Sequence, residues 1–317
     1  YPAWRQAVYP LAKGPPEEAG KEPLELTMRW DVGGFILGWT IRLVALPLAL
    51  VAAFSCYLEA EGYEFAIRAY LIPLILAAVV GQSLVSLARG ADIASRLRDR
   101  EAFASVALGW IPVVLLGALP YWLGGVFYGP AELSMDSVAV TDVMSGAIHS
   151  WFESMSGFTT TGSTVIDHAT SPRCTEGSDC ISSQPQSLIL WRSLTQWLGG
   201  MGVIMLGLLI LSQALGGGMS LARAELTGPS LSRLGPSLQW TARRLWTIYI
   251  VLTLIEMILL RFVGEMGLFD SVNYALTTLS SGGFGTSDSG IMAFDSARIE
   301  VILMVFMVLT CINFSLL

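Results

Sequence analysis

Long apolar segments alternate with short polar ones along most of the chain. Five of the apolar segments carry no charged residue: Leu43–Leu58, Ala69–Ala88, Ala102–Tyr128, Ser193–Ala222 and Val301–Leu317. A sixth segment, Leu245–Leu260, carries only Glu256. A helix that crosses a bilayer needs about 20 mostly apolar residues, and Arg42 can lengthen the first segment by reaching toward the headgroups. The pattern therefore predicts six membrane-spanning helices.

The composition agrees with this prediction. Of the 317 residues, 53% are hydrophobic and only 14% are charged, and the mean hydropathy is +0.61. Soluble domains carry about 25% charged residues, and polar faces interrupt their apolar segments. We therefore predict an all-α polytopic membrane protein embedded in a lipid bilayer, and we give the alternative of a soluble protein with a large core little weight. No nucleic-acid partner is expected.

Arginines gather in two of the connections between the predicted spans. The connection Ala88–Ala102 contains Arg89, Arg96, Arg98 and Arg100, and the connection Arg223–Arg244 contains Arg223, Arg233, Arg243 and Arg244. The other connections are acidic, and basic connections stay in the cytoplasm. With six spans, both ends of the chain are then predicted to be cytoplasmic. Since the net charge is −7, the acidic outer connections would also concentrate cations at an outer mouth.

A short helix is predicted at Met144–Phe158, between the third and fourth spans. Its apolar residues recur with helical spacing at Ile148, Trp151, Phe152, Met155 and Phe158. At roughly 15 residues it is too short to cross a hydrocarbon core of about 30 Å. A half-length helix followed by irregular backbone indicates a re-entrant loop, which is tolerated at membrane depth only inside protein or beside a water-filled cavity.

The segment after this helix, SGFTTTGSTV, is rich in hydroxyl groups and carries no charge. Carbonyl oxygens at close quarters can replace the water shell of an alkali cation. Gly162 would allow the backbone to leave the right-handed region and turn successive carbonyls toward one axis. The C-terminal end of the short helix carries partial negative charge, which also favours a cation. Thr160, Thr161, Gly162 and Ser163 are therefore predicted to bind a cation.

A second segment of the same design lies between the fifth and sixth spans. Phe269–Asp288 contains a short helical pattern that ends in SSGGF, and Gly283 aligns with Gly162 when the two segments are superposed. Ser280, Ser281, Gly282 and Gly283 become the second set of predicted cation-binding residues. A repeated unit of span, half-helix, glycine turn and span favours a pseudo-symmetric assembly.

Four stretches carry a family resemblance: FESMSGFTTTGSTV, LWRSLTQWLGGMGVIMLGLLIL, GGGMSLARAELTGP and LSSGGFGTSDSGIMAFDS. With these motifs the chain, from about Met28 to Leu317, resembles the Trk/Ktr/HKT superfamily of potassium transporters, most closely its TrkH-like subunits. The resemblance implies four span–pore helix–span units around one pore, with one filter glycine per unit. It also implies potassium as the transported ion, no organic cofactor, no enzyme activity and a place in the cell (inner) membrane. A homodimer and a cytoplasmic nucleotide-binding ring subunit are the partners that it implies.

Within that plan the chain divides into four parts. Residues 1–34 form an N-terminal cytoplasmic tail, 35–101 a leading pair of spans, 102–222 the first pore unit with its filter at 159–164, and 223–317 the second unit with its filter at 280–286. The third and fourth units of the family have no counterpart, so we expect a fragment or part of a split chain. A pore built from two copies is a weaker alternative. A non-conducting subunit and a sodium-permeable relative are the alternative functions, although Gly162 favours potassium by resemblance.

Several other residues allow two interpretations. Cys174 and Cys180 lie in a predicted outer loop, where we favour a disulfide over two free thiols. Glu153 in the first short helix is predicted to have a structural hydrogen-bonding role. Glu256 is either a functional acid within the membrane or a partner of Arg261, and the sequence favours neither.

Overall fold

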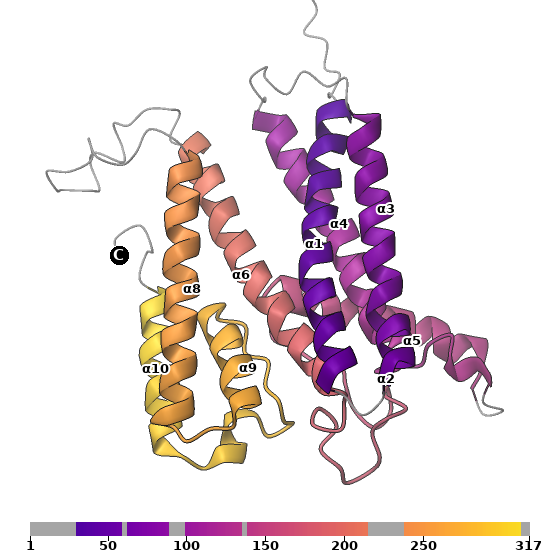
Figure 1. The fold of residues 1–317 in the computed structure, drawn as a ribbon, viewed down its shortest axis with the longest axis vertical. Helices are drawn as coiled ribbons and strands as arrows, with labels where there is room; N and C mark the ends of the chain where they lie inside the picture. Colours follow the sequence, from indigo (N-terminus) through magenta and orange to yellow (C-terminus); the bar gives the residue numbers. More distant parts are fainter. Residues whose placement is uncertain (1–29, 59–61, 89–98, 135–137, 215–237, 312–317) are drawn as a thin grey trace, which may run out of the picture.

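The computed structural model describes residues 30–58, 62–88, 99–134, 138–214 and 238–311. Helices and irregular connections make up these ranges, and no strand occurs within them. Figure 1 shows long helices that run roughly along the longest axis of the molecule, with the shorter helices gathered toward one end. The all-α fold predicted from the sequence is confirmed.

The leading part of the chain forms a helical pair. Helix α1 spans Trp30–Leu58 and packs along α3, which spans Ile72–Leu87. A short α2, Gly62–Ala66, and a π-helical turn η1, Ile67–Leu71, run directly into α3. Because the three pieces are continuous, Glu64–Leu87 forms one apolar span.

The two following units are built alike. In the first unit, α4 (Asp99–Leu123) is followed by α5 (Val140–Phe158) and α6 (Gln186–Ala214), with a 3₁₀ turn η2 at Glu132–Ser134. In the second unit, α8 (Leu238–Phe262) is followed by α9 (Leu268–Leu279), the 3₁₀ turn η4 (Gly290–Phe294) and α10 (Ala297–Cys311). Helix α9 lies against α8 and α6 and is much shorter than either (Figure 1). The order of long helix, short helix and long helix thus occurs twice.

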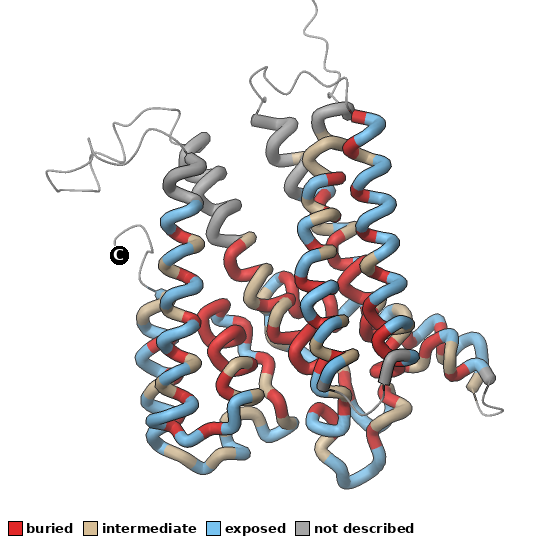
Figure 2. The backbone as a smooth tube through the Cα atoms, viewed as in Figure 1, coloured by how far each residue is buried: buried red, intermediate tan, exposed pale blue. Residues whose placement is uncertain are grey.

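Three helices in the described ranges are long and apolar enough to cross a bilayer by themselves. These are the helical stretches Gly33–Tyr57, Glu64–Leu87 and Arg243–Phe262, and Ala107–Leu123 is a shorter apolar helix. Large apolar side chains on them, such as Leu43, Leu46 and Ile258, are exposed, which is the pattern of helices that face lipid. Exposed positions recur along the long helices in Figure 2. The last predicted span is described only as far as Cys311.

Several helix boundaries differ from the sequence prediction, and two of them concern α5 and α6. Helix α5 begins at Val140 instead of Met144, and α6 begins at Gln186 instead of Ser193. The second difference has a clear cause. The charge of Arg192 marks the end of the apolar segment in the sequence, whereas in the fold this side chain is buried inside α6 and is paired with Glu153. A buried charge is tolerated where a partner and hydrogen bonds compensate it.

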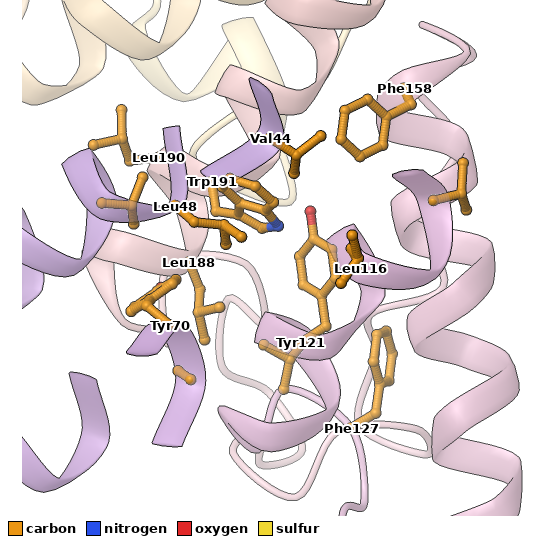
Figure 3. Close-up of a cluster of buried hydrophobic side chains, with 14 of the residues drawn as sticks. Val44, Leu48, Tyr70, Leu116, Tyr121, Phe127, Phe158, Leu188, Leu190 and Trp191 are labelled. Atoms are coloured by element: carbon orange, nitrogen blue, oxygen red, sulfur yellow. The ribbon is translucent and has the colours of Figure 1, made fainter. Parts of the chain in front are cut away.

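The main core joins the leading pair to the first unit (Figure 3). Trp191 of α6 is fully buried, and its indole Nε1–H donates to the carbonyl of Gly117 in α4 at 3.0 Å. Tyr70 of the π-helical turn donates to the Ser187 hydroxyl at 2.7 Å. Each large side chain thus buries its apolar body and satisfies its polar tip. The start of α6 is fixed by these contacts, and the polar residues one turn further along α6 are fixed with it.

The connections predicted to be cytoplasmic lie mainly outside the described residues, Arg89, Arg96, Arg98, Arg223 and Arg233 among them. The helix ends that lead into those connections belong to α3, α4, α6 and α8, and they lie together at one end of the molecule (Figure 1). The disulfide-containing loop between α5 and α6 lies at the opposite end. This arrangement agrees with the alternation of the predicted topology.

Candidate ion-binding site

The first glycine loop starts where α5 ends. Two backbone bonds close the helix: the N–H of Thr160 donates to the Gly157 carbonyl and the N–H of Thr161 donates to the Ser156 carbonyl, both at 3.0 Å. This pair of bonds is the Schellman arrangement, which requires a left-handed residue after the cap. Thr160 supplies it with φ of 54°, and Gly162 follows with φ of 77°.

The second loop repeats this geometry after α9. The N–H of Ser281 donates to the Thr278 carbonyl at 2.9 Å, and the N–H of Gly282 donates to the Thr277 carbonyl at 2.8 Å. Ser281 has φ of 54° and Gly283 has φ of 83°. Left-handed residues therefore occur at the same two positions of each loop. The register predicted from the glycines, with Gly283 on Gly162, is the register of the two backbones.

The two loops lie side by side. A Cβ atom added to Gly162 would clash with the carbonyl oxygen of Gly282, so the first loop passes directly against the second. Gly283 differs, because an added Cβ would meet no atom within 4 Å. The two loops thus form one continuous backbone surface, although Gly162 and Gly283 are 121 positions apart in the sequence.

Most of the carbonyls on this surface are unused by the protein. Within the described part of the chain, no hydrogen bond is donated to the carbonyl oxygens of Thr160, Thr161, Gly162, Ser163, Ser281 and Gly283. None of these six residues is buried, so their carbonyls are open to water or an ion, and carbonyls at membrane depth need such a partner. Helices α5 and α9 both direct their C-terminal ends at these loops, which adds partial negative charge. The surface is suited to a cation.

Gly282 and Ser280 also make contacts that the sequence did not predict. The Gly282 carbonyl accepts a hydrogen bond from Gln196 Nε2 at 3.0 Å, and Gln196 Oε1 accepts the N–H of Phe284 at 3.2 Å. The Ser280 hydroxyl turns back to its own helix and donates to the carbonyls of Leu276 and Thr277, each at 3.0 Å. Gln196 of α6 thus holds the second loop on both sides of Gly283.

A buried ion pair holds the first loop to the second. Arg192 Nε and Nη2 both lie 2.8 Å from Glu153 Oε1, and both side chains are almost fully buried. Glu153 also accepts the Thr164 hydroxyl at 3.0 Å and the Val165 N–H at 3.2 Å, so it holds the segment that follows Gly162. Arg192 Nη1 donates to the Gly285 carbonyl at 3.3 Å.

The guanidinium of Arg192 also lies over the Phe284 ring, 4.1 Å from its centroid. Arg192 therefore contacts the second loop twice while its ion pair holds the first. The structural role predicted for Glu153 corresponds to these contacts. Arg192 and Gln196 were not predicted as site residues. The one feature of the sequence that could have pointed to them is their spacing in LWRSLTQWLGG: they are four residues apart, which places them on the same face of a helix.

The structure also decides between the two interpretations that the sequence left open for the cysteine pair and for Glu256. Cys174 and Cys180 are joined by a disulfide in the loop between α5 and α6. Glu256 is fully buried in α8, whereas Arg261 donates to the Met266 carbonyl at 3.1 Å. A pair between Glu256 and Arg261, one of the two sequence interpretations, does not form.

Apolar helices, short helices that stop within the molecule, and paired glycine loops together define a polytopic membrane protein of the transport class. The sequence profile of the TrkH family, described as "Cation transport protein", matches residues 67–317. The chain belongs to this family. It is accordingly grouped with membrane transport proteins and not with enzymes.

Individual relatives support the same assignment. The chain is 38% identical over 221 residues to the Trk system potassium uptake protein TrkH of Halomonas elongata, covering 69% of this chain and 40% of that protein. It is 36% identical to the TrkH protein of Escherichia coli K12 over the same shares. It is 30% identical over 284 residues to the potassium uptake protein TrkG of E. coli K12, covering 89% of this chain and 50% of that protein.

A solved structure shares the fold. The crystal structure of the potassium transporter TrkH from Vibrio parahaemolyticus superposes with a TM-score of 0.70 at 24% identity, over 91% of this chain and 51% of that one. The chain thus spans about half the length, or less, of the relatives that it matches.

Proposed function

We propose that the two glycine loops are two adjacent walls of a potassium-selective filter, and that the chain is part of a potassium uptake transporter or channel. The observation that carries this proposal is the row of carbonyls from Thr160 to Ser163, together with those of Ser281 and Gly283, to which no described group donates. Neutral carbonyl oxygens in a partly dehydrated setting suit an alkali cation. The relatives named as potassium uptake proteins support the choice of ion.

Hydroxyl groups next to the carbonyls serve a second purpose in this proposal. The Thr159 hydroxyl donates to the Met155 carbonyl at 2.7 Å and lies 2.8 Å from the Thr161 hydroxyl, so these side chains brace the end of α5. The carbonyls, and not the hydroxyls, would then be the ion ligands. A sodium-permeable pore is the alternative, since filter geometry decides between the two ions and glycine at both loops favours potassium by family resemblance.

Two walls do not enclose an ion, so further walls are required. Some relatives are about twice as long as this chain, and in this proposal the further filter walls come from additional sequence of the same protein. In this proposal, the disulfide-containing loop faces the outside and both described ends face the cytoplasm. A homodimer in the inner membrane and a cytoplasmic nucleotide-binding ring subunit are proposed by family resemblance alone.

The test is ion flux through reconstituted protein. The chain as given and the chain joined to a TrkH-type C-terminal half would be placed in liposomes, and uptake of potassium, rubidium, sodium and caesium would be compared. We expect selective potassium and rubidium uptake only with the added half. Equal sodium and potassium uptake by the joined protein would contradict the potassium filter. Selective flux by the chain alone would support the two-copy pore instead.

A further inference from the structure

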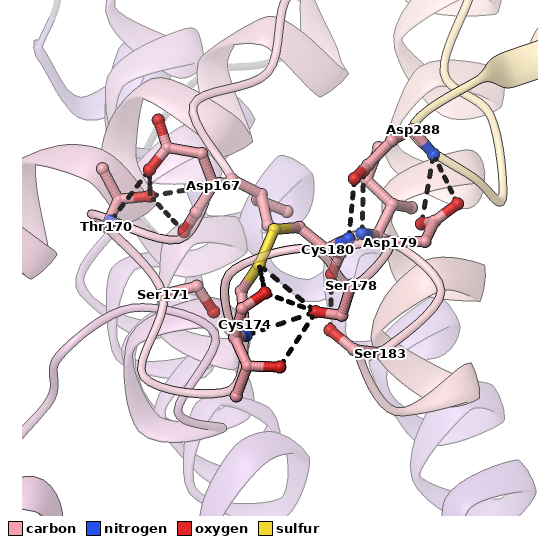
Figure 4. The surroundings of a disulfide bond; sticks show 12 residues. Asp167, Thr170, Ser171, Cys174, Ser178, Asp179, Cys180, Ser183 and Asp288 are labelled. Atoms are coloured by element: carbon pink, nitrogen blue, oxygen red, sulfur yellow. Dashed lines mark hydrogen bonds between the residues drawn. A yellow bond between two sulfur atoms is a disulfide. The ribbon is translucent and has the colours of Figure 1, made fainter.

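Two segments from different units meet outside the glycine loops (Figure 4). One is the disulfide-closed loop that carries Asp179, between α5 and α6. The other follows the second glycine loop and carries Ser287 and Asp288. They are about a hundred residues apart in the sequence, and their contact is made by two carboxylates.

The contact is reciprocal. Asp288 accepts the backbone N–H groups of Cys180 at 2.7 Å and Ile181 at 3.0 Å, one on each carboxylate oxygen. Asp179 accepts the backbone N–H of Asp288 at 3.1 Å and the Ser287 hydroxyl at 2.5 Å. Each segment thus supplies both a carboxylate and the donors for the other segment's carboxylate. Charge-assisted hydrogen bonds of this kind are the stronger class.

The loop that carries Asp179 is itself rigidly held. The Cys174–Cys180 disulfide closes it, and the Ser182 N–H donates to Asp179 at 2.8 Å. The Gln184 amide donates to the Cys180 carbonyl at 3.0 Å from a buried position. Partial burial alone would raise the pKa of Asp179, but the hydrogen bonds from Ser287, Ser182 and Asp288 hold it below its ordinary value. The carboxylate is therefore ionised throughout the neutral pH range.

The segment between Gly283 and Asp288 is short and is held along its length. Gln196 binds it at Phe284, and Arg192 binds the Gly285 carbonyl at 3.3 Å. The Thr286 hydroxyl donates to Asp270 of α9 at 2.7 Å. At Gly283 itself, an added Cβ would meet no atom within 4 Å. The carbonyl of Gly283 is thus positioned by restraints on its neighbours, and the outermost restraint is the contact between Asp179 and Asp288.

We propose that Asp179 and Asp288 form an outer latch that positions the second glycine loop against the first unit, so that cation selectivity depends on the latch and on the disulfide-closed loop that carries it. The two aspartates are positioning residues and do not contact the ion. This inference rests on the proposed filter. The carboxylate oxygens of Asp179 and Asp288 already accept hydrogen bonds from the protein. Their role therefore differs from that of acidic residues that only attract cations to the mouth.

The matched control is Asp167. It lies in the same outer loop and carries the same charge, but it accepts hydrogen bonds only from its own turn, from Ala169 at 2.7 Å and Thr170 at 3.0 Å. Asp167→Asn removes one outer charge without touching the second unit. Asp288→Asn removes one charge and replaces an accepting oxygen by an amide N–H group that faces a backbone donor.

The experiment measures the potassium-to-sodium permeability ratio of the complete transporter in liposomes. Asp179→Asn and Asp288→Asn should each lower the ratio by on the order of threefold to tenfold. The double variant should lower it no further than the worse single variant, since residues of one network are not additive. Asp167→Asn should leave the ratio unchanged. An equal loss in Asp167→Asn would overturn the latch in favour of surface charge, and a wild-type protein without potassium preference would instead refute the proposed filter.

A second readout does not depend on ion flux. Hydrogen exchange at the backbone amides of Cys180 and Ile181 should accelerate by on the order of tenfold or more in Asp288→Asn, since these amides lose their acceptor. Reduction of the disulfide should lower the selectivity ratio of the wild type and have no added effect in Asp288→Asn. Unchanged exchange in Asp288→Asn, or an equal effect of reduction in both proteins, would overturn the proposal.

Discussion

Gly162 and Gly283 occupy the same position in the two loops but differ in their surroundings. Both have positive φ, which costs a residue with a side chain on the order of 1–2 kcal/mol. Only Gly162 also has a neighbouring carbonyl, that of Gly282, in the place that a Cβ would need. A side chain at Gly162 must therefore displace the second loop, whereas one at Gly283 only strains its own backbone.

We predict that Gly162→Ser lowers the potassium-to-sodium preference more than Gly283→Ser does. Displaced carbonyls alter the ligand geometry that discriminates the two ions, and a penalty of about 1.4 kcal/mol on one ion relative to the other is a tenfold change. Competitive uptake at matched expression measures the ratio. Thr160→Ser is the control, since it keeps the hydroxyl and the backbone. If Thr160→Ser loses selectivity while both glycine variants keep it, side-chain hydroxyls are the ligands.

Thr160 and Ser281 show a feature that the glycine pattern does not reveal. Each is a left-handed residue with a side chain, held by two backbone bonds at the end of its helix. Such residues carry strain that the surrounding structure must offset, and they cluster at functional sites.

At the scale of elements, the Glu153–Arg192 pair joins α5, α6 and both loops. Removal of one partner from a buried pair costs about 3–5 kcal/mol, because the other charge is left uncompensated. We predict that Glu153→Gln and Arg192→Met each lower the midpoint of thermal unfolding in detergent. The double variant Glu153→Gln/Arg192→Met should recover part of the loss. A double variant as unstable as the sum of the two singles would show that the side chains act separately.

The two short helices end in the same way. Helices α5 and α9 both end at a glycine loop, and in each case a serine or threonine caps the C-terminus. The second span of the first unit, α6, then supplies Arg192 and Gln196 to the second loop. A unit therefore positions its neighbour's loop through its own second span. This explains why polar residues occur on an otherwise apolar helix.

At the scale of the whole molecule, orientation in the membrane follows from the distribution of arginines. We predict that the loop with Cys174 and Cys180 faces the outside. In a Cys56→Ser/Cys311→Ser background, a membrane-impermeant maleimide should label this loop on intact cells after reduction. Labelling only after permeabilisation would show that the orientation is reversed.

The sequence by itself determined the helical class, the approximate positions of the apolar helices and the register of the two glycine loops. These are local properties: the length of an apolar segment, its periodicity, and the glycine that allows a left-handed turn. The family resemblance rests on the same local motifs, and the match to residues 67–317 agrees with it.

Only the tertiary structure decided which side chains hold the loops. Arg192 ended a span in the sequence because isolated charges are excluded from the bilayer, and it is inside α6 because Glu153 from another helix compensates it. The same holds for three other side chains, whose hydrogen-bond partners are about 85 to 110 residues away in the sequence: Gln196, Asp179 and Asp288. A hydrogen bond or an ion pair depends on distance in space, which apolar periodicity and motif spacing do not encode.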